Sequence, residues 1–117
     1  MKRVLVIEDD LVSNLLLSAL IRDQGFTTMS AHSIQETRDL LDLESFQFIF
    51  VDNKLPDGSG IEFLPEIRSR QPKAFVIVMS AESFKDNIDK AHDNGANEFL
   101  SKPLSHREIK RVLNGNQ

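Results

Sequence analysis

Acidic side chains gather at two places in this sequence where an apolar run ends. Glu8, Asp9 and Asp10 follow "VLVI" directly, and Asp52 closes "FQFIFVD". Two carboxylates 4 Å apart repel each other by about 4 kcal/mol at an effective dielectric constant near 20, so such a cluster calls for a cation. Magnesium prefers carboxylate, carbonyl and water oxygens, and at acidic sites it commonly serves phosphoryl groups. These residue types therefore predict metal-assisted phosphoryl chemistry.

Two more polar side chains stand at comparable points. Ser80 closes "AFVIVMS", and Lys102 follows "EFLS". A lysine could pair with a phosphoryl oxygen and a hydroxyl could donate to another, while a carboxylate acts as the nucleophile. The chain has no cysteine, and its three histidines do not cluster in the sequence, so a site for a soft metal is not expected.

The elements that must position these residues can be predicted from short apolar runs, capping patterns and turn residues. Three helices begin with a capping pattern, in which a serine precedes an acid by three residues. A helix with Pro65 in its interior is awkward unless the proline lies in the first turn or so. The predicted strands are Arg3–Ile7, Thr27–Ala31, Phe46–Asp52, Ala74–Ser80 and Glu98–Ser101. The predicted helices are Leu15–Gly25, Ser33 to about Leu43, Ile61–Arg70, Ser83 to about Asn94 and Ser105 to about Leu113.

Strands and helices that alternate at this spacing predict an α/β fold. The strands should be parallel and joined by right-handed crossovers, giving a doubly wound five-stranded sheet with helices on both faces. Ligands of such sheets bind beyond the carboxyl ends of the strands. The acids, Ser80 and Lys102 all follow strand ends, so we expect them to converge at one edge.

Composition limits the classes of function. The 117 residues suit one domain, 1–117, with 114–117 as a frayed end or the start of a linker. The net charge of -4 argues against direct nucleic-acid binding. No apolar run approaches the roughly 20 residues of a membrane span, and the N-terminus lacks a signal-peptide pattern. We therefore expect a soluble, cytoplasmic protein without a membrane partner.

Four motifs in order give the chain a specific resemblance: the acids after "VLVI", then "VDNKLPDGSG", "VIVMSA" and "FLSKP". Over essentially its whole length it resembles the receiver domain of bacterial two-component response regulators. The resemblance implies a flavodoxin-like (βα)5 fold with strand order 2-1-3-4-5. It also implies a signalling receiver, not a conventional enzyme, that takes a phosphoryl group from a histidine kinase or a histidine phosphotransferase.

The same resemblance assigns roles to the acidic residues. Asp52 matches the phosphoryl acceptor, and the backbone carbonyl of Lys54 matches a ligand to magnesium, for which manganese could substitute. Glu8 and Asp9 match the other metal-site acids, with Asp9 as the direct ligand and Glu8 acting through water. Asp10 is assigned to the start of the first helix instead.

Further roles fall on residues near the later strand ends. Ser80 matches the hydroxyl that moves toward the phosphoryl group, and Phe99 matches the aromatic switch residue that turns inward when it does. Lys102 matches the lysine that pairs with the phosphoryl group, and the Lys102–Pro103 peptide matches one that is typically cis. Output would then appear on the face formed by the fourth helix, the fifth strand and the fifth helix. That face is expected to bind partners or a second protomer, through Lys90, Asn94, Asn97 and Phe99.

Some positions depart from the family pattern or tune it. Ser59 precedes Gly60 where aspartate is frequent, and Phe99 stands where tyrosine is frequent. Lys54 and Glu82 are interpreted as modulators of the lifetime of the aspartyl phosphate. Asp57 and Gly58 are interpreted as plain turn residues.

Three other functions remain open at this stage. A magnesium-dependent phosphohydrolase could use Asp52 as its nucleophile, although Lys54 occupies the position where such enzymes typically place a second acid. A flavin-binding module would need a ring-stacking Tyr or Trp, and the chain has neither. A degenerate receiver could serve only for dimerisation, although its acidic pocket is intact in sequence.

Overall fold

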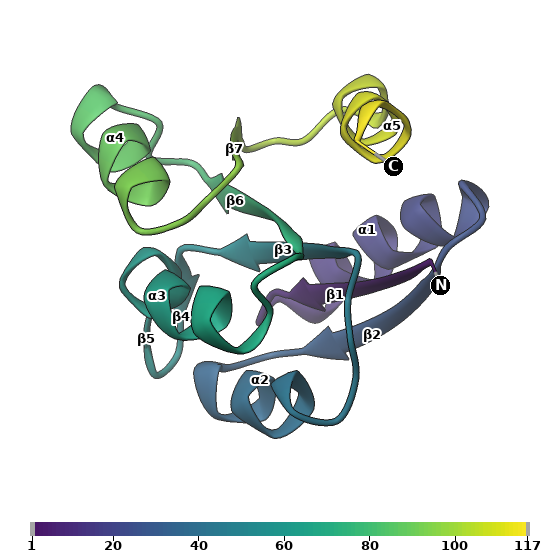
Figure 1. Cartoon of the computed structure of the whole chain (residues 1–117). Helices are drawn as coiled ribbons and strands as arrows, with labels where there is room; N and C mark the ends of the chain where they lie inside the picture. The colour runs from purple at the N-terminus through teal and green to yellow at the C-terminus, as the bar shows by residue number, and fades with distance from the viewer. Residues whose placement is uncertain (1, 117) are drawn as a thin grey trace.

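The computed structural model describes residues 2–116 and shows a parallel sheet between two layers of helices (Figure 1). The helices are α1 Leu11–Asp23, α2 Ile34–Leu41, α3 Gly60–Arg70, α4 Lys85–Asp93 and α5 His106–Gly115. The sheet strands are β1 Arg3–Ile7, β2 Thr27–Ala31, β3 Phe48–Asp52, β6 Phe75–Ser80 and β7 Glu98–Ser101. Two short strands, β4 Lys54–Leu55 and β5 Gly58–Ser59, form a separate hairpin.

The sheet has the order β2-β1-β3-β6-β7, and every neighbouring pair is parallel. Counting only these five strands, this is the predicted order 2-1-3-4-5, so the predicted fold class is confirmed. The register aligns Ile7 with Val51, Asp52 with Met79, and Ser80 with Ser101. The polar residues in this set, Asp52, Ser80 and Ser101, therefore lie at the same edge of the sheet.

Alternate residues of the central strands face two separate cores. Val4, Val6, Phe48 and Phe50 pack under α1 and α5, and their neighbours in the strands pack under α2, α3 and α4. Figure 1 shows these two helix groups on opposite sides of the sheet. Burial on both faces explains why β1 after Arg3 and β3 before Asp52 are continuously apolar instead of alternating. Across residues 2–116, no helix is long and apolar enough to cross a membrane.

Helix α1 begins four residues earlier than predicted. It starts at Leu11, because the Asp10 carboxylate accepts a hydrogen bond from the Ser13 amide at 2.9 Å and caps the helix. The predicted start at Leu15 is therefore wrong, and the role of Asp10 at the start of the first helix is confirmed. The buried stripe of α1 is Asn14, Leu17, Ser18 and Ile21, which leaves Leu16 exposed.

Other predicted boundaries were partly right. The Ser33 and Ser105 hydroxyls cap α2 and α5, and Ser105 and Glu108 form a reciprocal capping box. Ser83 and Asp86 do not cap α4, whose N-cap is Phe84 without a side-chain hydrogen bond. Helix α5 continues to Gly115, so only the last part of the predicted frayed end lies beyond it, and Gln117 lies outside the described residues.

Pro65 lies in the second turn of α3, not in the first. A proline has no N–H, so the carbonyl of Ile61 loses its helical donor. The Asn94 side-chain amide, at the end of α4, donates to this carbonyl at 3.0 Å. Asn97 is engaged as well, because its side-chain oxygen accepts from the Val76 amide and from Arg68. Both asparagines, which were expected to meet partners, thus bond within the fold.

Gly60, the first residue of α3, lies against the end of β3. A Cβ atom at this position would lie 2.2 Å from the carbonyl oxygen of Asp52 and 2.9 Å from a methyl carbon of Val51. Backbone cannot yield to such an overlap as a flexible side chain would. Gly60 therefore lets the helix start directly beside the strand end that carries Asp52.

We expect Gly60→Ala to destabilise the protein by roughly 1–3 kcal/mol, in the range for overpacking a tight interior. Urea denaturation followed by circular dichroism measures the change. Gly115→Ala is the matched control, since a Cβ at Gly115 meets nothing within 4 Å. Equal stability of the two variants would contradict the packing argument.

Candidate functional site

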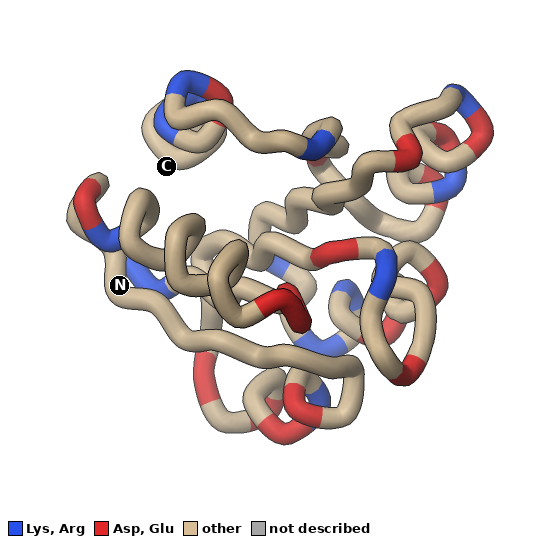
Figure 2. The backbone as a smooth tube through the Cα atoms, turned by 180° about the vertical axis from the view of Figure 1, so that it is seen from behind, with Lys and Arg blue, Asp and Glu red and all other residues tan. Residues whose placement is uncertain are grey.

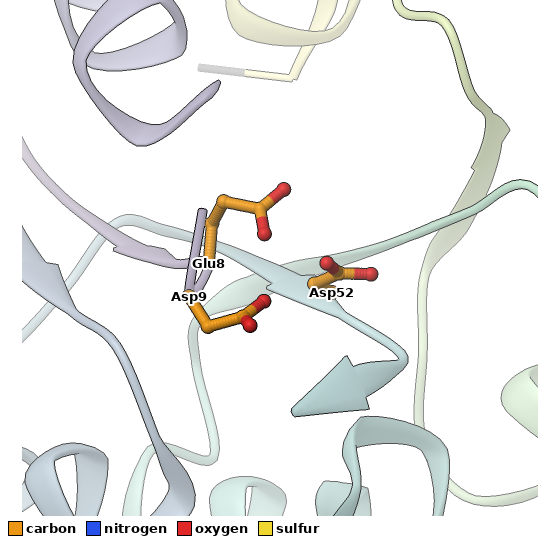
Figure 3. Close-up of side chains that lie close together, drawn as sticks. All are labelled: Glu8, Asp9 and Asp52. Carbon is orange, nitrogen blue, oxygen red and sulfur yellow. The ribbon is translucent and has the colours of Figure 1, made fainter. Parts of the chain in front are cut away.

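The polar residues that follow the strands meet at the carboxyl edge of the sheet. Glu8 and Asp9 follow β1, and Asp52 ends β3. One oxygen from each of these three carboxylates lies within 4.8 Å of the others. Figure 3 shows the three side chains directed into one space from two adjacent strand ends. Glu8 and Asp52 are buried and Asp9 is exposed, so the cluster opens toward solvent on the Asp9 side.

Lys102 joins two of these acids. Its Nζ lies 2.7 Å from Oε1 of Glu8 and 2.9 Å from Oδ2 of Asp52. The Lys102–Pro103 peptide is cis, as predicted. Burial alone would lower the pKa of Lys102, but the hydrogen bonds and charges of Glu8 and Asp52 raise it above its ordinary value. The lysine is therefore a fixed positive charge between the two carboxylates.

Glu8 shows the electrostatic strain of the cluster. Burial raises the pKa of Glu8 above its ordinary value, and the neighbouring Asp52 carboxylate raises it further. Lys102 offsets only part of this effect. The largest effect is desolvation and the next is the side-chain hydrogen bond with Asp52, and both favour the protonated form of Glu8. A divalent cation among the three acids would relieve this penalty, and its carboxylate ligands are of the type that hard cations prefer.

Asn14 supports the turn that carries Glu8 and Asp9. Its side-chain amide donates to the carbonyl oxygens of Val6 and Glu8, and its oxygen accepts from Ser18 and Ser30. The side chain is buried within α1. Asn14 was not among the predicted site residues, although a polar side chain on the buried face of a largely apolar helix was a signal for it.

The loops after β3 and β6 meet at the rim of the site. The Lys54 amide donates to Oδ1 of Asp52 at 3.4 Å, while the Lys54 side chain extends into solvent. Its Nζ lies 3.5 Å from Oε1 of Glu82, so the two predicted modulators face each other across the loops. The position two residues after Asp52 thus supplies a cation and no acid.

The predicted switch residues occupy different environments. Ser80 is buried, and its hydroxyl accepts a hydrogen bond from the Glu82 amide at 3.0 Å. Phe99 is partly buried and packs against the core that lies under α2, α3 and α4. The Ser80 hydroxyl is therefore held by the loop that follows β6, and the Phe99 side chain is only partly buried in the core.

Asp57 is not a plain turn residue. Its carboxylate accepts hydrogen bonds from the amides of Ile34 at 2.8 Å and Gln35 at 3.0 Å, the first two residues of α2. These bonds, the one from Ile34 foremost, lower the pKa of Asp57 below its ordinary value. Because the helix lies more than twenty residues away in sequence, local pattern analysis could not pair the two.

Helix α1 has an unusual surface beside the site. Leu11, Val12, Leu15 and Leu16 are all more than 60% exposed. Figure 2 shows the acidic segment at the start of α1, followed by helix without a charged residue until its last turn. A groove of about 490 Å³ runs between this helix and the segment from Lys102 to Ile109.

Comparisons with known proteins agree with this geometry. Residues 4–114 match the family model of the response regulator receiver domain. The response regulator PilR of Pseudomonas aeruginosa is 30% identical over 112 residues, which cover 96% of this chain and 25% of PilR. The transcriptional regulatory protein PdtaR of Mycobacterium tuberculosis is 32% identical over 109 residues, covering 92% of this chain and 53% of PdtaR. The chain thus spans a quarter to a half of these relatives.

Solved structures show the same likeness. The beryllofluoride-activated NtrC4 receiver domain dimer superposes with a TM-score of 0.93 and 32% identity, covering 99% of this chain and 96% of that one. A Burkholderia pseudomallei response regulator with a phosphorylated aspartic acid, a calcium ion and citrate gives a TM-score of 0.91 and 29% identity, covering 97% and 66%. With its acidic pocket at the edge of a flavodoxin-like sheet, this chain belongs to the receiver domains of two-component response regulators.

Proposed function

We propose that this receiver accepts a phosphoryl group on Asp52 from the phosphohistidine of a histidine kinase or a histidine phosphotransferase, with magnesium as the metal. One observation carries the proposal: three carboxylates meet within 4.8 Å, and Lys102 bridges two of them. The phosphorylated aspartic acid and calcium of the Burkholderia relative support it. Residues 1–117 would form one receiver domain that acts in the cytoplasm as a signalling switch with no separate substrate.

The chemistry follows from the positions of the side chains. A carboxylate oxygen of Asp52 attacks phosphorus, the bond between phosphorus and the donor's imidazole nitrogen breaks, and its electron pair stays on that nitrogen. Bound magnesium would neutralise charge on the phosphoryl oxygens. Asp9, Asp52 and the Lys54 carbonyl would hold the ion directly, and Glu8 would hold it through water. Lys102, whose Nζ lies 2.9 Å from Oδ2 of Asp52, would pair with a phosphoryl oxygen.

Phosphorylation adds roughly -1.5 to -2 charges to this pocket. The new oxygens would accept a hydrogen bond from the Ser80 hydroxyl and draw Ser80 toward Asp52, away from the Glu82 amide that donates to it here. This movement would leave room for Phe99 to turn inward. This would bias two conformations of the face formed by α4, β7 and α5. The dimeric state of the activated NtrC4 receiver supports a homodimer as one output.

The donor must cover the surface around Asp52 during transfer. The exposed apolar residues of α1 and the groove beside Lys102 flank that opening. We propose that the phosphohistidine-bearing partner packs an apolar helix face there, since burial of these side chains would supply affinity without involving the acids.

The first test is phosphorylation itself. Incubation with acetyl phosphate and magnesium should add the mass of one phosphoryl group to the intact protein, and Asp52→Asn should abolish the gain because it removes the nucleophile. Mass spectrometry of the intact chain, with and without EDTA, measures this. Asp23→Asn, at the far end of α1, is a control that should behave as the parent does. A gain that survives Asp52→Asn would overturn the assignment.

The second test separates Asp9 from Asp10. Magnesium at about 100 times its dissociation constant should stabilise the parent by about 2.7 kcal/mol, since it binds the folded state only. We expect Asp9→Asn to remove most of this stabilisation and Asp10→Asn to keep it, because an asparagine still caps α1. Thermal unfolding with and without magnesium checks both variants. Loss of the stabilisation in Asp10→Asn alone would reverse the ligand assignment.

The third test concerns the lifetime of the aspartyl phosphate. Lys54 can pair with the phosphoryl group or with Glu82 and obstruct attacking water. We expect Lys54→Asn to lose the phosphoryl group about two- to fivefold faster, since an exposed ion pair contributes at most about 1 kcal/mol. Decay after removal of acetyl phosphate, followed by intact mass, gives the rate. Lys73→Asn, an exposed lysine far from the site, is the control, and decay of Lys54→Asn no faster than this control contradicts the idea.

A further inference from the structure

The hairpin of β4 and β5 carries the Lys54 carbonyl, yet each of its strands has only two residues. A two-stranded hairpin of this size is not stable by itself in water. Its position relative to Asp52 must therefore be set by contacts with the rest of the domain. Since a metal ligand has to be held to within a fraction of an ångström, these contacts decide how well the site is formed.

One end of the hairpin is fixed to the sheet and to α3. The Asn53 side-chain oxygen accepts from the Ser59 hydroxyl at 2.8 Å and from the Ile61 amide at 3.1 Å. The Gly60 amide donates to the Asn53 carbonyl at 2.7 Å. Together with the buried Leu55 side chain, these bonds hold the base of the hairpin.

The other end, the turn at Pro56 and Asp57, is fixed to α2. The Asp57 carboxylate binds the Ile34 and Gln35 amides, which point out of the helix N-terminus. Charged acceptors at this position are favoured by the helix dipole and form short, strong hydrogen bonds. Gly58 also touches α2, since a Cβ there would lie 2.8 Å from Cδ1 of Ile34, and its φ of +153° suits glycine.

Helix α2 is capped without Asp57. The Ser33 hydroxyl accepts from the Glu36 amide at 3.0 Å, and the Ser33 carbonyl accepts from the Thr37 amide at 3.1 Å. Asp57 takes the two remaining N-terminal amides of the helix. Its bonds thus connect the metal-binding hairpin to α2 and do not simply complete a cap within one element.

We propose that Asp57 is a positioning residue, which anchors hairpin β4–β5 to α2 and thereby places the Lys54 carbonyl for the cation. The inference rests on the proposed function, because it assigns that carbonyl to magnesium. Coupling between two sites is reciprocal. Magnesium should therefore strengthen the bonds from Asp57 to α2, just as these bonds strengthen magnesium binding.

The experiment compares magnesium binding by the full chain and by three variants, using isothermal titration calorimetry. Asp57→Ala should raise the dissociation constant about tenfold, as loss of an outer-shell contact does at metal sites. Asp57→Asn keeps one acceptor oxygen and should fall between. Ser33→Ala is the matched control, because it removes a bond at the same helix end without touching the hairpin, and it should bind magnesium as the parent does.

Two further readouts separate positioning from general destabilisation. In phosphorylation by acetyl phosphate, Asp57→Ala should need more magnesium for half-maximal rate and reach the parent rate at saturation. Amide hydrogen exchange at Ile34 and Gln35 should slow on addition of magnesium in the parent and not in Asp57→Ala. If Asp57 only stabilised the fold, Asp57→Ala would leave the magnesium dependence unchanged. Ser33→Ala would then show the same effects as Asp57→Ala.

The outcomes distinguish this inference from the proposed function. A parent protein that binds no magnesium overturns both. A parent that binds magnesium and accepts a phosphoryl group, with Asp57→Ala binding magnesium equally well, overturns the inference alone. Equal weakening in Asp57→Ala and Ser33→Ala also overturns it, because the effect would then belong to α2 and not to the hairpin.

Discussion

Repulsion among three carboxylates at the end of two central strands is the constraint on which this structure depends. Glu8, Asp9 and Asp52 lie close enough to share one cation, and two of them are buried, where like charges cost most. Lys102 compensates for part of this charge through direct contacts with Glu8 and Asp52. The fold therefore maintains a local excess of negative charge, which a divalent cation bound among these three carboxylates would offset.

The rest of the domain serves to keep that excess of charge in place. The apolar residues of β1 and β3 pack on both faces of the sheet, and the register of the two strands brings Ile7 level with Val51. Asn14 holds the turn after β1, and Gly60 allows α3 to start against the carbonyl of Asp52. These supports come from opposite faces of the sheet, so the acids are held by both cores.

Much of this could be predicted from sequence, since the signals were local. Apolar runs marked the three central strands, β1, β3 and β6, and polar residues at or directly after their ends marked the edge where the site lies. The predicted helix starts were wrong at two places. Asp10 caps α1, which begins four residues before the predicted start, and Ser83 fits a capping pattern although Phe84 is the N-cap of α4. The roles of Asn14 and Asp57 depend on partners elsewhere in the fold, such as Ser30 and Ile34, and no pattern in one stretch of sequence contains that information.

The bond from Asn94 to the Ile61 carbonyl links the mechanics of two helices. Pro65 deprives that carbonyl of its helical donor, so α3 is complete only while the end of α4 stays beside it. Any rearrangement that moves α4 away leaves the backbone carbonyl of Ile61 without this hydrogen bond, and Ile61 is a residue only 2% exposed. An unsatisfied polar group of this kind costs about 1–3 kcal/mol, which corresponds to a population ratio of roughly 5 to 150. Because of Pro65 in α3, the domain is thus more stable when the end of α4 lies beside α3, as it does in this structure.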